Sequence, residues 1–249
     1  PLRDVYKRQP QGSVLGPLLF IIYINDFCFL NIKSELHLFA DDTTLSSHHS
    51  NPDNILLNLS SDLPIICEWL KHNRLIVNLK KTQAMFFSHY LRKSKEYKEK
   101  INSLKLIFDD CNIAFIKEIK ILGVIIDDEL KFDSHISYIC KKANSKTFLL
   151  QKSLYLFTDK FKPTLYKLFI QSYFDYCATL TLRCPNPISQ VKLNKCFMKS
   201  IKRLLKINLF SLSIEAQHER LKELNILPIY YRIFMRFSSF LFSICKYKN

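Results

Sequence analysis

The chain has 249 residues, with 37 Lys and Arg against 22 Asp and Glu, which gives a formal charge of +15. Hydrophobic residues make up 48% of it, enough for a buried core, and this excludes disordered, collagen-like and coiled-coil classes. The charge excess lies in residues 134–249, which carry 20 basic and 5 acidic side chains, whereas the preceding residues are balanced. Such a field favours a nucleic-acid backbone as partner, with a membrane surface as the weaker candidate.

Cysteine spacing and the apolar runs limit the other partners. Eight cysteines are scattered without a C-x-x-C pair, so we expect no structural zinc and no disulfide framework, but buried thiols in a reducing, intracellular compartment. The longest apolar run, Leu15 to Ile24, has ten residues and is too short to span a bilayer. We therefore expect no membrane-spanning segment, and nucleic acid in place of a membrane as the partner.

The first nine residues, PLRDVYKRQ, have no apolar periodicity and resemble a translated sequencing adaptor. We interpret residues 1–9 as a non-native peptide and exclude them from reasoning about the fold. On this interpretation, the native chain is expected to continue upstream of Pro10.

The elements predicted next are a helix and a hairpin. Ser13 is suited to cap a buried helix that runs to Phe27. Residues 35–40 and 43–45 are β-prone and flank Asp41–Asp42. This pattern predicts a hairpin with two carboxylates at its turn.

A helix and several short strands are predicted between the hairpin and residue 132. Apolar residues at helical spacing over 55–70 predict an amphipathic helix that ends near Asn73, and Pro64 should kink it. The charged stretch 89–103 is expected to be an exposed loop. Strands are predicted at 75–79, 84–88, 104–108, 113–116 and around Gly123 at 119–126.

The chain becomes helical after Asp133. Prolines near the breaks separate helix-length stretches at 136–157, 160–182, 188–206, 213–224 and 229–247. The fold class predicted is therefore α+β, with a mixed region over 10–132 and an all-helical basic region over 133–249. The expected contacts to a nucleic-acid backbone are the basic residues of one helix: Lys192, Lys195, Lys199, Lys202, Arg203 and Lys206.

Adjacent carboxylates occur three times, at Asp41–Asp42, Asp109–Asp110 and Asp127–Asp128. Such a pair is most often a solvated turn. The first pair differs because a predicted strand lies on each side of it. Carboxylates on a rigid hairpin can hold Mg²⁺, which combines one or two carboxylates with substrate phosphates.

Four motifs resemble the reverse transcriptase domain of non-LTR (LINE-like) retrotransposons and occur in the order found in that family. They are P-Q-G-S-V-L-G-P-L-L-F-x-x-Y-I-N-D from Pro10, F-A-D-D from Phe39, E-W-L with N-x-L-x-x-N-x-x-K-T from Glu68, and I-L-G-V-x-I-D-x-x-L-x-F-x-x-H-I from Ile121. The resemblance implies a partial polymerase palm, an antiparallel hairpin sheet with packed helices, up to residue 132. It is weaker over 137–249, which is similar to the thumb and downstream region.

The resemblance also implies the chemistry of the parent enzyme. Asp41 and Asp42 match the catalytic, metal-binding carboxylates, Asp41 being the firmer ligand. Two Mg²⁺ ions would assist transfer of deoxynucleotides from their triphosphates to a DNA primer 3′-OH on an RNA template.

Other matched residues receive binding roles from the same resemblance. Gln11 and Gly12 match the segment that touches the incoming nucleotide and the template. Lys81 matches a lysine near the nucleotide phosphates, and Leu122–Gly123 matches the primer grip. Taken singly, these residues also suit an ordinary turn, a surface lysine and a packing glycine.

The family carries a further catalytic aspartate upstream of the Q-G segment, before the matched part of this sequence. We therefore expect the chain as written to lack useful polymerase activity. The alternative is a decayed or co-opted remnant that only binds nucleic acid. A group II intron maturase fits the spacing after F-A-D-D less well. Nuclear action is implied by the resemblance alone.

Overall fold

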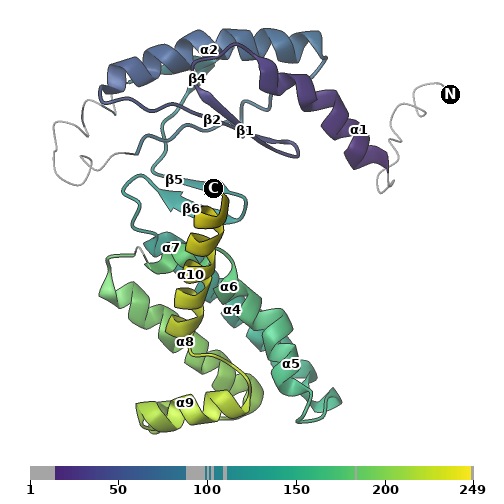
Figure 1. Cartoon of the computed structure of the whole chain (residues 1–249), viewed down its shortest axis with the longest axis vertical. Helices are drawn as coiled ribbons and strands as arrows, with labels where there is room; N and C mark the ends of the chain where they lie inside the picture. The colour runs from purple at the N-terminus through teal and green to yellow at the C-terminus, as the bar shows by residue number, and fades with distance from the viewer. Residues whose placement is uncertain are drawn as a thin grey trace. The chain divides into compact units, whose positions relative to one another are not determined.

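The computed structural model of the chain describes residues 15–87, 99, 101, 104–108, 111–182 and 184–247. These belong to two compact units, one formed by residues 1–86 and 94–116 and the other by residues 87–93 and 117–249. The described residues form helices and three two-stranded antiparallel sheets, as Figure 1 shows. The α+β class is compatible with this architecture.

Helix α1 (Leu15–Ile24) and the 3-10 turn η2 (Asn25–Phe29) begin the described part of the first unit. The prediction of a buried helix is wrong, since α1 has no buried residue and Leu19 is 61% exposed. α1 is apolar on every side, so no single stripe selects a packing face. α1 is attached near its end by the Tyr23 hydroxyl, which donates to the backbone carbonyl of Asn73. η2 is anchored by Phe27, whose ring stacks on Trp69 with centroids 4.4 Å apart. The expected cap Ser13 lies outside the described residues.

A hairpin and a long helix follow. Strands β1 (Glu35–Phe39) and β2 (Asp42–Ser46) pair antiparallel, which confirms the predicted hairpin. The prediction that both carboxylates lie at its turn is wrong for Asp42, which pairs with Phe39 as the first residue of β2. Helix α2 (Pro52–His72) begins three residues before its predicted start, because the side chain of Asn51 accepts a hydrogen bond from the backbone N–H of Asp53. The helix continues through Pro64 to His72, so the proline interrupts its hydrogen bonding without ending it.

The remaining strands of this unit are shorter than predicted. Strands β3 (Leu106–Phe108) and β4 (Cys111–Ile113) pair antiparallel. β3 covers part of the predicted range 104–108, whereas β4 shares only Ile113 with the strand predicted at 113–116. The strands expected at 75–79 and 84–88 are absent from the described residues there, apart from an isolated bridge from Ala84 to Phe115. Strand-prone residues form no sheet without a partner strand. The loop expected at 89–103 lies largely outside the described residues.

The second unit begins with a hairpin, where a single strand around Gly123 was predicted. β5 (Glu118–Ile121) and β6 (Val124–Asp127) pair antiparallel through a two-residue turn. Both turn residues have positive φ, 46° for Leu122 and 83° for Gly123, as a tight hairpin turn requires. The hairpin therefore belongs to the same compact unit as the helices that follow it. The division of the chain into a palm over 10–132 and a thumb region over 133–249 stays a prediction.

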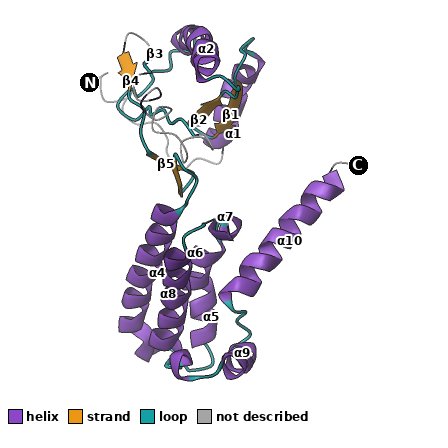
Figure 2. Ribbon diagram, turned by 90° about the vertical axis from the view of Figure 1, so that its left-hand side faces the viewer, coloured by secondary structure: helices purple, strands orange, loops and turns teal. Residues whose placement is uncertain are grey.

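Helices make up the rest of this unit (Figure 2). The helix predicted over 160–182 is interrupted by a π-helical turn and by the backbone at Cys177, whose φ is 50°. The helical elements are α4 (Asp133–Ser153), η4 (Leu154–Leu156), α5 (Lys162–Tyr166), η5 (Lys167–Gln171), α6 (Ser172–Asp175), α7 (Ala178–Leu182), α8 (Pro187–Leu205), η6 (Leu209–Ser211), α9 (Ile214–Glu223) and α10 (Ile229–Tyr247). No helix among the described residues is long and apolar enough to cross a membrane.

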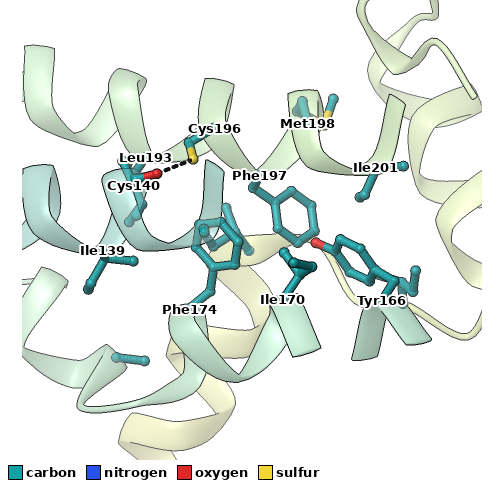
Figure 3. Packing of buried hydrophobic residues seen from close by; sticks show 14 of the residues in the cluster. Ile139, Cys140, Tyr166, Ile170, Phe174, Leu193, Cys196, Phe197, Met198 and Ile201 are labelled. Atoms are coloured by element: carbon teal, nitrogen blue, oxygen red, sulfur yellow. Dashed lines mark hydrogen bonds between the residues drawn. The ribbon is translucent and has the colours of Figure 1, made fainter. Parts of the chain in front are cut away.

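Aliphatic side chains packed around the three rings of Tyr166, Phe174 and Phe197 fill the core of the helical unit (Figure 3). The ring of Phe197 packs edge-on against Tyr166 and Phe174, with centroids 6.3 and 5.7 Å away. Burial raises the pKa of the Tyr166 hydroxyl above its ordinary value. The expectation of buried thiols is correct for three cysteines. It is wrong for three others, which lie on solvent-facing sides of their helix or strand. Cys140, Cys184 and Cys196 are buried, while Cys28, Cys111 and Cys245 are exposed.

Candidate functional site

The carboxylate pair lies at the β1–β2 hairpin. Phe39 pairs with Asp42, so Ala40 and Asp41 form the two-residue turn, and Ala40 has the positive φ of 52° that reverses the chain. Both carboxylates are exposed and are of the oxygen-donor type that Mg²⁺ prefers. Among the described residues, no cluster of three or more His, Cys, Asp or Glu side chains could hold a metal. The pair therefore fits a metal that takes its other ligands from water, substrate or further protein groups.

A buried carboxylate on α2 anchors the segment that leads into this hairpin. Asp62 is 1% exposed and accepts hydrogen bonds from the backbone N–H of Lys33 at 3.0 Å and of Ser34 at 2.8 Å. Burial raises the pKa of the Asp62 carboxyl, but hydrogen bonds from Ser34, Lys33 and Ser61 outweigh it, so the net pKa is below the ordinary 3.8. Asp62 thus fixes where β1 begins.

Replacing Asp62 with Asn is expected to lower the free energy of unfolding by about 1–3 kcal/mol, because one buried N–H loses its charged acceptor. Urea denaturation at pH 7 measures this loss. Glu68→Gln makes the same chemical change at an exposed position of α2 and should cost less than about 0.5 kcal/mol. Equal effects of the two changes would contradict the anchoring role.

The same substitution should alter acid sensitivity. The folded-state pKa of Asp62 lies below 3.8, so its carboxylate contributes stability above pH 3.8 that is lost as the pH falls through the folded pKa. The difference in unfolding free energy between the native chain and Asp62→Asn should therefore shrink below pH 3.8.

The matched nucleotide-binding residues are only partly within the described chain. Lys81 lies in a turn in which its N–H and that of Thr82 both donate to the carbonyl of Asn78, at 2.9 and 3.0 Å. Gln11 and Gly12 lie outside the described residues. Asp41, Asp42 and Lys81 belong to the first unit, and the Leu122–Gly123 turn and the basic residues of α8 to the second.

The Leu122–Gly123 turn is supported by a tyrosine that sequence reasoning missed. The Tyr176 hydroxyl donates to the carbonyl oxygen of Leu122. A Cβ added to Gly123 would lie 3.5 Å from Cε1 of Tyr176. No periodic or motif signal pointed to Tyr176, because it lies 54 residues from Leu122 in sequence.

The residues that follow this hairpin in the fourth motif have structural roles. The carboxylate of Asp127 accepts from the backbone N–H of Lys131 at 2.8 Å and of Phe132 at 2.6 Å. His135 is 1% exposed, and its Nδ1 accepts from the backbone N–H of Ile125 at 3.4 Å. Burial lowers the pKa of the His135 imidazole. These contacts fix the turn from β6 into α4.

The basic residues of α8 form one continuous surface, here called the α8 basic stripe. Successive helical residues are about 100° apart, which places the five side chains that belong to α8 within an arc of about 100°. Lys206 is the residue that caps the end of the helix, with a φ of 56°. Each of the six is exposed. The stripe consists of Lys192, Lys195, Lys199, Lys202, Arg203 and Lys206.

Helix α4 runs beside α8 in the same direction (Figure 2). Three contacts in the same order along both helices establish this: Ser189 donates to Asp133, Lys192 to Ser137, and Cys196 to the carbonyl of Cys140. The stripe therefore lies along the flank of a helix pair. Its first lysine is held there, with Nζ 2.8 Å from Ser137 Oγ.

A second group of lysines surrounds an aromatic ring on α4. Lys120 on β5 donates to the Tyr138 hydroxyl at 3.1 Å, and Nζ of Lys142 lies 5.7 Å from the ring centroid. The hydrogen bond with Lys120, together with the charges of Lys120 and Lys142, lowers the pKa of Tyr138. One turn further on, Nζ of Lys146 lies 5.4 Å from the ring centroid of Phe169. Basic and aromatic groups alternate here, as on surfaces that bind nucleic acid.

Comparisons with known proteins bear on these features. A family model described as "Reverse transcriptase (RNA-dependent DNA polymerase)" matches residues 2–126, half of the chain. A protein of Drosophila melanogaster named "Probable RNA-directed DNA polymerase from transposon X-element" is 24% identical over 191 residues, covering 74% of this chain and 20% of that protein. No solved structure matches the chain.

A second relative extends the likeness further along the chain. The "Retrovirus-related Pol polyprotein from type-1 retrotransposable element R1" of Bradysia coprophila is 22% identical over 223 residues, covering 81% of this chain and 21% of that protein. Both alignments are longer than the family match and extend beyond residue 126. The chain spans about one fifth of the length of these relatives.

Proposed function

Because this chain belongs to the reverse transcriptase (RNA-dependent DNA polymerase) family, we propose that it is part of the RNA-directed DNA polymerase of a non-LTR retrotransposon. Residues 10–132 form part of the palm, and residues 133–249 the thumb and downstream region. The observation that carries this proposal is the F-A-D-D hairpin, which has Asp41 in its turn, Asp42 beside it and a strand on each side.

Asp41 and Asp42 would hold Mg²⁺ in the complete active site, with Asp41 the firmer ligand. When bound, the metal supplies activation of the primer 3′-OH and charge stabilisation at the reacting phosphate. The β1–β2 pairing and the Asp62 anchor keep the carboxylates in one place. Such preorganisation is what metal-assisted transfer requires of the protein.

The partners proposed are an RNA template, a DNA primer and deoxynucleoside triphosphates. Gln11, Gly12 and Lys81 bind the nucleotide and the template. The Leu122–Gly123 turn holds the primer 3′ end. The α8 basic stripe binds phosphates of the nucleic-acid backbone, which its continuous positive charge supports.

Catalysis belongs to a longer polypeptide in which a further aspartate completes the metal site. We propose that the 249-residue chain by itself binds a primer–template without extending it. By family resemblance, the site of action is intracellular and nuclear.

Genomic sequence upstream of the Pro10 codon tests this proposal. An open frame that encodes a further aspartate on a predicted strand supports it, and the protein expressed from that frame should extend a DNA primer on RNA with Mg²⁺. Asp41→Asn should reduce extension by about three orders of magnitude, whereas Asp159→Asn, at an exposed position, should not. Stop codons upstream would contradict the proposal, and so would primer extension that survives Asp41→Asn. The alternative, a remnant that only binds nucleic acid, would then be favoured.

A further inference from the structure

The Leu122–Gly123 turn makes few contacts of its own. It joins two four-residue strands, and Leu122 is 42% exposed. Its backbone has positive φ at both positions, which costs free energy at the non-glycine Leu122. A turn of this kind keeps one conformation only when neighbouring groups hold it.

Tyr176 is such a group. Its hydroxyl donates to the Leu122 carbonyl, and its ring lies at van der Waals distance from the position that a Cβ at Gly123 would take. Tyr176 is itself 52% exposed, so it contributes little to the core. The contact therefore fixes the turn, while most of the tyrosine remains at the surface beside it.

The residue that precedes Tyr176 is held by α10. Arg232 makes two hydrogen bonds to the carboxylate of the preceding residue, Asp175, at 2.9 and 2.5 Å. The Gln171 side chain, with its amide oxygen turned toward Arg232, accepts from the same guanidinium at 2.7 Å. This two-bond contact of the guanidinium, the Arg232 fork, fixes Asp175 at the end of α6. Tyr176 is the next residue, so its backbone position is restricted too.

We propose that Tyr176, held by the Asp175–Arg232 pair, is a positioning residue that sets the Leu122–Gly123 turn for the 3′ end of the primer. This inference rests on the function proposed above and adds the residues that keep the primer-binding turn in place. It also links α10, through Arg232, to the turn. Tyr176 acts through the Leu122 carbonyl and not on the reacting atoms.

The test uses the 249-residue chain and an RNA template annealed to a DNA primer with 4-thiothymidine at its 3′ end. Irradiation should crosslink the primer to the peptide that contains residues 118–127. Tyr176→Phe should lower this crosslink about fivefold, the effect of one lost hydrogen bond, while the dissociation constant for the duplex changes less than about twofold. Tyr173→Phe, the same change three residues earlier, within α6, is the matched control.

The outcomes separate this inference from the proposed function. A native crosslink at 118–127 that is equally strong in Tyr176→Phe overturns the positioning role and leaves the proposed function standing. Binding of the duplex without a crosslink at 118–127 overturns the primer-binding role of the turn, and this inference with it. Arg232→Lys, which keeps the charge but loses the fork, should also weaken the crosslink, and an unchanged yield would remove α10 from the linkage.

Discussion

Arg232→Ala is expected to lower the free energy of unfolding of the chain by about 3 kcal/mol. The side chains of Arg232 and Asp175 are only 16% and 18% exposed, and the guanidinium is bidentate. Removing it leaves the Asp175 carboxylate partly buried, with Arg236 at 4.0 Å as its remaining ion-pair partner among the described residues. Thermal and urea denaturation followed by circular dichroism measure the loss.

Arg220→Ala provides the matched control. Arg220 pairs with Glu223 on α9, but these side chains are 51% and 59% exposed. Solvent screens such a pair, so its loss should cost less than about 1 kcal/mol. If both substitutions cost the same, the fork between α10 and α6 is not a principal anchor, and the linkage from α10 to Tyr176 loses its basis.

The β1–β2 hairpin could be predicted from the sequence because its information is local. β-prone residues on each side of a two-residue turn determine both the pairing and the position of Asp41. The α8 basic stripe was equally accessible, since helical spacing alone places five of its six side chains on one face, Lys206 following the end of the helix. Both features follow from residue patterns within a short stretch of sequence.

Contacts between residues far apart in the sequence could not be predicted from such local patterns. Tyr176 meets Leu122 across 54 residues, and Lys120 meets Tyr138 across 18. The break at Cys177 carries neither Gly nor Pro, so no local signal marks it. Tertiary packing decides such contacts, and a single sequence does not encode them as a pattern.

Burial of α1 was mispredicted for a related reason. An apolar run predicts that a helix will be covered, but it does not identify what covers it. The run from Leu15 to Ile24 did form a helix, although none of its residues is buried and most are exposed. Element type therefore followed from composition, whereas burial depended on a facing surface.

Neutralising three lysines of the α8 basic stripe should weaken binding of an RNA–DNA duplex by about 100-fold at 0.15 M salt. Each phosphate contact contributes a slope of about 0.9 to the dependence of log affinity on log salt. The triple change Lys195→Gln, Lys199→Gln and Lys202→Gln should therefore reduce the slope by close to three. Fluorescence anisotropy at several salt concentrations measures both quantities.

The control must remove the same charge elsewhere in the chain. Lys160, Lys222 and Lys246 are exposed residues of the same unit outside α8, and their replacement by Gln changes the net charge equally. If the stripe contacts phosphates directly, this second triple variant should keep most of the affinity and nearly the full slope. If the two variants lose affinity equally, the overall positive charge of the unit attracts the duplex, and α8 is not a specific binding surface.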